Sequence, residues 1–173
     1  MQATDPIIDL FERVREEVQA VLMGAEAGVL GYRPDRHANT IAWLVWHLTR
    51  VQDDHIAAAY DSEQVWTSAG WADRFGLPFG VTVTGYGQTS TEAGRVLVDG
   101  ELLHGYHEAV AERTVQLLRS TDAADLDRIV DMRWDPPVTL AVRLISVASD
   151  DLQHVGQAAY VRGLAERALG ERA

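Results

Sequence analysis

Two side chains that readily bind metal ions, Asp150 and His154, lie four residues apart in a long segment of apolar periodicity. At about 100° per residue of an α-helix, they project from nearly the same face, one turn apart. Burying a carboxylate and an imidazole in a helix is costly unless the two groups act together. The spacing suits two ligands of one divalent ion. The simpler interpretation is a helix that carries a few solvated polar residues.

A second histidine, His47, is directed toward the interior by the periodicity of its own segment. Apolar residues share its helical stripe, namely Trp43, Leu44, Val51 and Ala58. Seven residues later, Asp54 returns to within about 20° of the direction of His47, whereas His55 is about 80° away from it. Apolar residues also flank the direction of His154, namely Leu140, Val147, Ala158 and Val161. Both segments therefore aim a histidine and a carboxylate at the interior.

The resulting donor set is His47, His154 and one of two adjacent carboxylates, Asp150 or Asp151. Asp150 falls within the inward stripe. Asp151 points about 60° from the direction of His154, on the side opposite Asp150. Two nitrogens and one oxygen around a divalent ion leave coordination positions open for water or a substrate, which is typical of catalytic zinc. Because the chain has no softer ligands, zinc, nickel, iron and manganese all fit this set.

A second pattern, Glu101 with His104, could combine with residues 151–154 to give the paired Glu-x-x-His-like elements of a di-iron helical bundle. The helical phase argues against this, because Glu101 and His104 point about 160° and 100° away from the core stripe. His107 lies nearer, at about 40°, and could line the cavity. The sequence therefore argues against a di-iron centre.

Four long segments of helical periodicity must position these residues. They cover about residues 5–25, 40–60, 92–119 and 138–169. An Asn39-Thr40 cap precedes the second segment, and Pro136-Pro137 precedes the fourth. Four helices of about 20 to 30 residues predict an all-α fold, an antiparallel four-helix bundle with one core. The length of 173 residues fits one domain over residues 1–173.

The connection from about residue 61 to residue 88 is long for a compact domain, where such loops are usually functional. Aromatic residues are concentrated in it, namely Trp66, Trp71, Phe75, Phe79 and Tyr86. We expect the loop to pack over one end of the bundle, with turns at residues 76–78 and 85–87. It would serve either as a structural loop or as the wall of a pocket.

The composition excludes several classes of protein. The chain has 15 basic and 26 acidic residues, a net charge of −11 and no cysteine, and every basic residue is an arginine. A lysine base or Schiff base is thereby excluded, and the lack of a basic stripe argues against nucleic-acid binding. No apolar run approaches the roughly 18 residues that cross a membrane, and residues 1–20 lack a secretion signal. We expect a cytoplasmic protein.

Two stretches resemble the DinB/YfiT-like superfamily of metal-binding four-helix bundles. They are residues 39–48, Asn-Thr-Ile-Ala-Trp-Leu-Val-Trp-His-Leu, and the element Asp150-x-x-x-His154-x-Gly156-Gln157. Residues 134–140, Trp-Asp-Pro-Pro-Val-Thr-Leu, are similar to the branch associated with mycothiol-dependent S-transferases. The resemblance covers nearly the whole chain, including residues 71–75 and 84–87 of the long loop.

The resemblance implies a specific ligand set. In that superfamily a histidine of the second helix and an H-x-x-x-H or E-x-x-x-H pair of the last helix bind the metal. Carried over residue by residue, these are His47, Asp150 and His154. Asp150 departs from the family's histidine or glutamate and is one methylene shorter than glutamate, so Asp151 or a bridging water is the alternative. Zinc and nickel are the ions expected first.

The resemblance also implies an activity, the transfer of mycothiol, a low-molecular-weight thiol, to an electrophilic small molecule. A metal with an open position can bind and deprotonate a thiol, which suits a chain without cysteine. Asp54 is expected to act as a base or to hold His47 in its tautomer, and His55 to do so less directly. Arg50 is expected to meet an anionic group of the substrate.

Two other functions fit the same residues. A metal-dependent hydrolase or isomerase would use metal-bound water in place of the thiol. A non-catalytic helical module would keep the polar cluster as a vestigial or regulatory metal site. The oligomeric state is left open, with a homodimer as one alternative.

Overall fold

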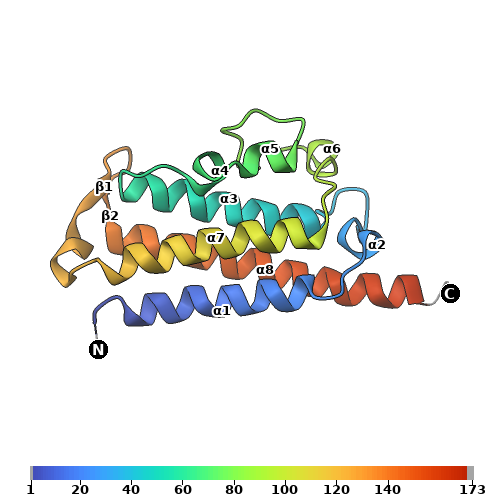
Figure 1. Cartoon of the computed structure of the whole chain (residues 1–173), viewed down its shortest axis with the longest axis horizontal. Helices are drawn as coiled ribbons and strands as arrows, with labels where there is room; N and C mark the ends of the chain where they lie inside the picture. Colours follow the sequence, from blue (N-terminus) through green and yellow to red (C-terminus); the bar gives the residue numbers. More distant parts are fainter. Residues whose placement is uncertain (1, 171–173) are drawn as a thin grey trace.

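The computed structural model describes residues 2–170, and within them four long helices lie side by side (Figure 1). They are α1 (Asp5–Leu22), α3 (Ile41–Ala59), α7 (Gly100–Arg119) and α8 (Leu140–Gly170). Both α1 and α3 pack against α7 and α8, so α1 and α3 lie diagonally across the core. The predominantly helical fold predicted from the sequence is confirmed. None of the described helices combines the length and apolar composition needed to span a bilayer.

Capping groups set the ends of these helices. The Thr40 side chain accepts a hydrogen bond from the Trp43 amide at the start of α3, and Asp99 does the same for Leu102 at the start of α7. These contacts satisfy amides that lack a partner within the helix. The third long helix therefore begins at Gly100 rather than near residue 92, where the sequence predicted it. The short helix α6 (Ser90–Ala93) occupies the earlier position, with its own capping box.

The remaining elements are short. They comprise α2 (Ala27–Leu30), α4 (Val65–Ser68), α5 (Trp71–Phe75), the 3-10 helix η1 (Ala123–Asp127), and strands β1 (Ile129–Asp131) and β2 (Val138–Thr139). The strands pair antiparallel, with Ile129 opposite Thr139 and Asp131 opposite Val138. The sequence analysis did not predict this hairpin, which adds a small sheet to the mostly helical fold. Strands of two or three residues are too short to show the alternating pattern by which strands are recognised.

The long aromatic loop lies along the side of α3 and α7 at mid-length, and not over one end of the bundle as the sequence predicted (Figure 1). Three of its aromatic rings surround the buried Tyr106 of α7. The ring centroids of Trp66, Phe75 and Trp71 lie 5.1, 5.6 and 5.7 Å from that of Tyr106. Burial of these large rings holds the loop against the bundle.

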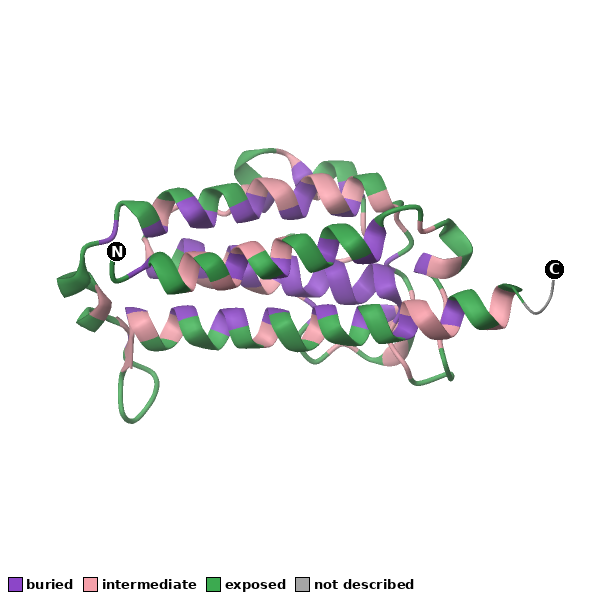
Figure 2. Ribbon diagram, turned by 90° about the horizontal axis from the view of Figure 1, so that it is seen from below, coloured by how far each residue is buried: buried purple, intermediate pink, exposed green. Residues whose placement is uncertain are grey.

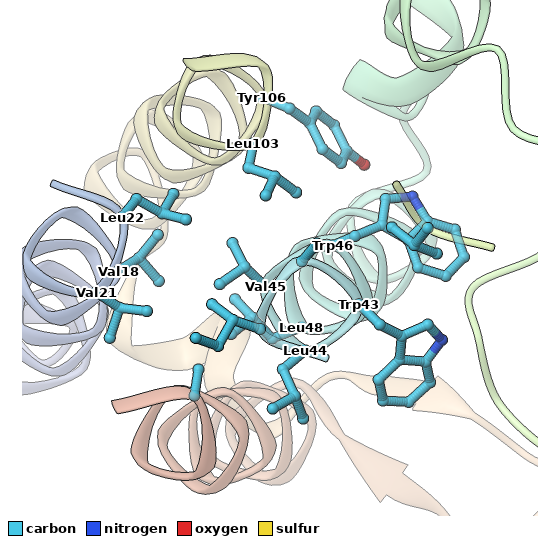
Figure 3. Close-up of a cluster of buried hydrophobic side chains, with 14 of the residues drawn as sticks. Val18, Val21, Leu22, Trp43, Leu44, Val45, Trp46, Leu48, Leu103 and Tyr106 are labelled. Atoms are coloured by element: carbon cyan, nitrogen blue, oxygen red, sulfur yellow. The ribbon is translucent and has the colours of Figure 1, made fainter. Parts of the chain in front are cut away.

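α3 is the most deeply buried of the long helices, because the bundle covers one side of it and the loop covers another. Leu44, Val45 and Leu48 face the other long helices, whereas Trp43 and Trp46 point toward the loop (Figure 3). Figure 2 shows the contrast with the other long helices, which each keep an exposed face. The helix that carries His47 is thus fixed from both sides.

A polar layer crosses the middle of the bundle between two apolar clusters of the core. His107 of α7 is fully buried, and its Nδ1 lies 3.1 Å from the Thr49 hydroxyl of α3. Burial lowers the pKa of His107 to about 4. The imidazole is therefore neutral at neutral pH. The sequence placed His107 close to the core stripe, and the structure buries it completely.

We expect His107 to make the protein sensitive to acid. Because its pKa is lowered on folding, its stabilising effect is complete above its unfolded value near 6.5 and is lost as the pH falls toward 4. The loss between pH 6.5 and 4 amounts to about 3 kcal/mol. Urea unfolding of the wild type and of His107→Gln over this pH range measures the loss. All other groups titrate in both proteins, so the difference between the two pH curves reports His107 alone. Parallel pH curves for the two proteins would contradict the prediction.

Candidate metal centre

Three ligand atoms converge where α3 packs against α8. His47, Asp150 and His154 each bring one to within 4.8 Å of the others. The imidazole centroids lie 4.9 Å apart with their planes at 73°, and Asp150 Oδ1 lies 3.7 Å from His154 Nε2. The structure thus brings together the three residues that the resemblance pointed to. Two nitrogens and one carboxylate oxygen form a group that could hold a divalent ion.

Each imidazole is oriented through its Nδ1 atom. His47 Nδ1 lies 2.6 Å from the carbonyl oxygen of Thr84, and His154 Nδ1 lies 3.0 Å from Oε1 of Gln157. Both partners are acceptors, so each Nδ1 carries the proton and donates it. This tautomer leaves the Nε2 lone pair free, as a metal ligand requires. Gln157, which the sequence analysis noted only as part of a motif, therefore orients a ligand from one turn away.

Burial and charge at the group also favour a bound cation. Burial lowers the pKa of His47, and the nearby His154 lowers it further, so His47 stays neutral and able to coordinate. The Trp43 ring stacks on that of His47 at 4.5 Å. Asp150 Oδ2 is buried and has no hydrogen-bond partner among the described residues. Such an orphaned carboxylate oxygen is costly without a compensating charge, which a divalent ion would supply.

The end of the aromatic loop covers His47. Gly85 has a φ of +101°, and a Cβ atom there would lie 2.7 Å from His47 Nδ1 and 3.1 Å from the Trp46 ring. The Gln88 side chain accepts a hydrogen bond from Trp43 Nε1 at 2.7 Å. Only glycine allows the backbone to approach this closely. Sequence analysis missed Thr84 and Gly85 as supports of the site, although the turn at residues 85–87 and the resemblance of residues 84–87 to the superfamily were both signals.

Asp151, the alternative ligand, lies outside the group. It is fully buried on the core side of α8, in the polar layer, and neither oxygen has a hydrogen-bond partner among the described residues. Burial raises the pKa of Asp151 well above its usual value, and the charge of Asp150 raises it further. The two carboxylates are therefore divided: Asp150 lies at the edge of the α3–α8 contact, and Asp151 lies inside the core.

Arg50 is fully buried and makes structural contacts where a substrate contact was expected. Its guanidinium lies 4.9 Å from the centre of the Trp66 ring and donates to Gln64 and to the Tyr106 hydroxyl. Asp53 Oδ2 lies 3.7 Å away. The loop closes over this side of α3, which removes Arg50 from solvent. Its predicted meeting with an anionic substrate group is therefore corrected to a structural role.

Asp54 and His55 lie about two turns along α3 from His47, and neither is bonded to it. Asp54 accepts from the Gln64 amide at 2.7 Å, and His55 Nδ1 lies 3.2 Å from Arg143 Nη1. Burial lowers the pKa of His55, and Arg143 lowers it further. The Thr84 carbonyl occupies the position at His47 Nδ1 that the sequence analysis assigned to Asp54 or His55.

Asp53, and not Asp54, is the buried carboxylate of α3. It accepts hydrogen bonds from the amides of Val65 and Trp66 and from the Tyr106 hydroxyl, at 2.7 to 2.8 Å. These bonds tie the start of α4 to α3 and α7. Sequence analysis missed Asp53 because the phase was measured against the stripe that faces the bundle, whereas Asp53 faces the loop.

We expect Asp53→Asn to lower the free energy of unfolding by about 2–4 kcal/mol. The side-chain amide of Asn would place its N–H group opposite buried donors that now bond to the Asp53 carboxylate. Asp54→Asn is the matched control and should change stability by less than about 0.5 kcal/mol, since Asn keeps an acceptor for Gln64. Urea unfolding of both variants measures the difference. Equal effects of the two substitutions would show that the Asp53 contacts do not hold the loop.

Comparisons with known proteins agree with this architecture. A crystal structure described as the conserved protein of a locus from Enterococcus faecalis is similar, with a TM-score of 0.89 and 30% sequence identity. The match covers 95% of this chain and 98% of that chain. No curated protein matches the sequence. The family model of the DinB superfamily matches residues 10–158. The chain therefore belongs to the DinB superfamily.

Proposed function

We propose that this protein is a divalent-metal-dependent S-transferase that joins mycothiol to an electrophilic small molecule. The observation that carries the proposal is the group of His47, Asp150 and His154, with two oriented Nε2 atoms and one carboxylate. Three protein ligands leave positions for an exchangeable group, as in catalytic zinc sites. Zinc or nickel suits this donor set. The chain has no cysteine, so a thiol nucleophile has to come from a cosubstrate.

An ion held by these residues would act as a Lewis acid that favours the deprotonated form of a bound thiol at neutral pH. The residues of the chain contribute orientation and access. Trp43, Thr84 and Gly85 close the His47 side of the group. The side chains of His154 and Asp150 remain 19% and 41% exposed, so substrates reach the group along α8.

The proposed transfer needs no oxidant or reductant. The thiol loses its proton to solvent, its sulfur forms a bond to an electrophilic carbon, and a leaving group departs from that carbon with the bonding electron pair. Asp54 and His55 lie about 10 Å along α3 from His47, so they contact only a substrate of that length. A cytoplasmic location, where low-molecular-weight thiols stay reduced, belongs to the same proposal.

The test is product formation by protein loaded with zinc or nickel, using 1-chloro-2,4-dinitrobenzene as the electrophile. We expect the mycothiol adduct and free chloride to form faster than in the spontaneous reaction of the thiol only when protein, metal and mycothiol are all present, and at the spontaneous rate with Asp150→Ala. Replacing mycothiol with glutathione tests whether the protein requires mycothiol as its thiol cosubstrate. Consumption of an electrophile or ester without thiol would favour the hydrolase or isomerase instead. Bound metal without turnover of any electrophile tried would favour the non-catalytic module, and either result would overturn the proposal.

A further inference from the structure

A line of accessible polar side chains follows the contact between α3 and α8 beyond the candidate metal centre. Starting from His47 and His154, it passes Asp150 and His55 and ends at Arg143 in the first turn of α8. Arg143 and Asp150 are seven residues apart, so they project from the same face of α8, about 10 Å apart along its axis. The side chains of His55 and Asp150 are 37% and 41% exposed. An elongated molecule held at the metal centre therefore reaches Arg143 along this line.

Arg143 fixes the tautomer of His55. Arg143 Nη1 lies 3.2 Å from His55 Nδ1. Because a guanidinium group has no acceptor, it donates this hydrogen bond and Nδ1 accepts it. The imidazole proton of His55 is therefore on Nε2, whereas His47 and His154 carry theirs on Nδ1. Burial lowers the pKa of His55, and the charge of Arg143 lowers it further, so the ring is neutral at neutral pH.

His55 thus presents an N–H donor to the line. Among residues 2–170, Arg143 is the one hydrogen-bond partner of the His55 side chain, and it engages Nδ1 alone. The carboxylate of Asp54 lies 4.0 Å from Nδ1, beyond hydrogen-bond distance, and accepts from Gln64 of the long loop. Since the lone pair of the ring is already occupied by Arg143, the group that meets Nε2 has to be a hydrogen-bond acceptor.

Two arginines give the end of the line a positive charge. Arg143 donates from Nη2 to Asp131 Oδ2 at 2.7 Å and is 14% exposed. Arg133, in the turn between β1 and β2, donates to both oxygens of Asp131 at 2.8 and 2.9 Å and is 82% exposed. Figure 1 shows this hairpin beside the end of α3 and the start of α8. Two guanidinium groups share one carboxylate, so these three residues together keep a net positive charge next to His55.

We propose that the electrophilic substrate carries a carboxylate, and that His55, Arg143 and Arg133 bind it at this end of the α3–α8 contact. The inference rests on the proposed function, since it names the class of electrophile. Guanidinium groups and a neutral N–H donor suit a carboxylate, whose two oxygens accept several hydrogen bonds. The three residues determine which substrate binds and touch none of the reacting atoms. Arg143 thereby takes the role that Arg50, buried beneath the loop, does not fill.

Two electrophiles that differ in one group test the proposal. 4-Chloro-3-nitrobenzoate carries a carboxylate in place of the 4-nitro group of 1-chloro-2,4-dinitrobenzene. With metal-loaded protein and mycothiol, we expect Arg143→Gln to lower kcat/KM for the benzoate about 10- to 100-fold, mainly through KM, and to leave kcat/KM for the dinitro compound within about twofold. Arg143→Lys should restore part of the loss, because it keeps the charge. Arg13→Gln, which removes an exposed charge on α1, is the matched control and should change neither value.

The donor role of His55 has its own pair of variants. His55→Phe keeps a ring and removes the N–H group, so it should raise KM for the benzoate about 10-fold and leave KM for the dinitro compound unchanged. His55→Gln keeps an N–H donor and should retain most of the wild-type KM. Nitrogen NMR of the wild type should show the His55 proton on Nε2. A proton on Nδ1, or equal effects of the two variants on KM, would remove His55 from the carboxylate site.

Equilibrium binding separates this inference from the proposed function. 3-Nitrobenzoate lacks a leaving group, so calorimetry of its binding needs no turnover. We expect Arg143→Gln to weaken its binding about 10- to 100-fold and to leave the binding of nitrobenzene unchanged. Binding through Arg143 without turnover of any electrophile would refute the transfer and support the carboxylate site. Equal losses for the acid and the neutral compound, or no binding of 3-nitrobenzoate to the wild type, would refute the carboxylate site even where transfer is observed.

Discussion

Replacing His154 with alanine is expected to abolish tight metal binding while the fold survives. His154 supplies one of two imidazole nitrogens in the group, and its Nε2 lies 3.7 Å from the Asp150 carboxylate. Loss of a residue that only orients a ligand weakens metal affinity about 10- to 100-fold, so loss of the ligand itself should cost at least about 100-fold. Elemental analysis of purified protein and competition with a chelator of known affinity would measure the change.

The control for this substitution is His104→Ala. His104 lies on α7, is half-buried, and among residues 2–170 pairs only with Glu108, at 3.7 Å. It is the histidine that a di-iron centre would need, so its removal also tests that alternative. We expect one metal ion per chain in the wild type and in His104→Ala, and none in His154→Ala. If His104→Ala lost metal as well, the centre would extend to α7 and the three-residue group would be incomplete.

The location of the candidate centre could be predicted from helical phase. Its residues lie on two long helices, α3 and α8, and the apolar stripe of each helix shows which residues face inward. His47 and His154 both lie on helices with clear apolar stripes, and the structure brings their rings to 4.9 Å. The choice between Asp150 and Asp151 was harder, because adjacent residues differ by about 100° and either can be called inward. The structure separates them: Asp151 is fully buried in the core, where burial raises the pKa of its carboxyl, whereas Asp150 lies beside His154 in the group of three.

The surroundings of the site could not be predicted, because they depend on how the long loop folds. Thr84 reaches His47 only because Trp66, Trp71 and Phe75 pack around Tyr106 and hold the loop against α3. These contacts join residues far apart in the sequence and have no periodicity of their own. Arg50 is buried for the same reason. Helical phase predicted the direction of its side chain, but it could not predict that the loop would cover it.

Gly85→Ala should weaken metal binding about 10- to 100-fold, although residue 85 offers no ligand. The added methyl would lie 2.7 Å from His47 Nδ1 and 3.2 Å from the Trp43 ring, so the loop or the imidazole must move. Either movement breaks the hydrogen bond from His47 to the Thr84 carbonyl, which fixes the tautomer that coordinates metal. Metal affinity of the folded variant is the measurement, with circular dichroism to establish that the helices are intact.

Gly87→Ala separates this steric effect from backbone strain. Gly87 also has a positive φ, +74°, but a Cβ there would have no neighbour within 4 Å. Both substitutions should therefore cost about 1–2 kcal/mol of stability through the left-handed conformation. Only Gly85→Ala should also lower metal affinity, because only its methyl reaches His47. Equal losses of affinity in the two variants would mean that the loop acts through its overall stability, and that the Thr84 contact does not position the ligand.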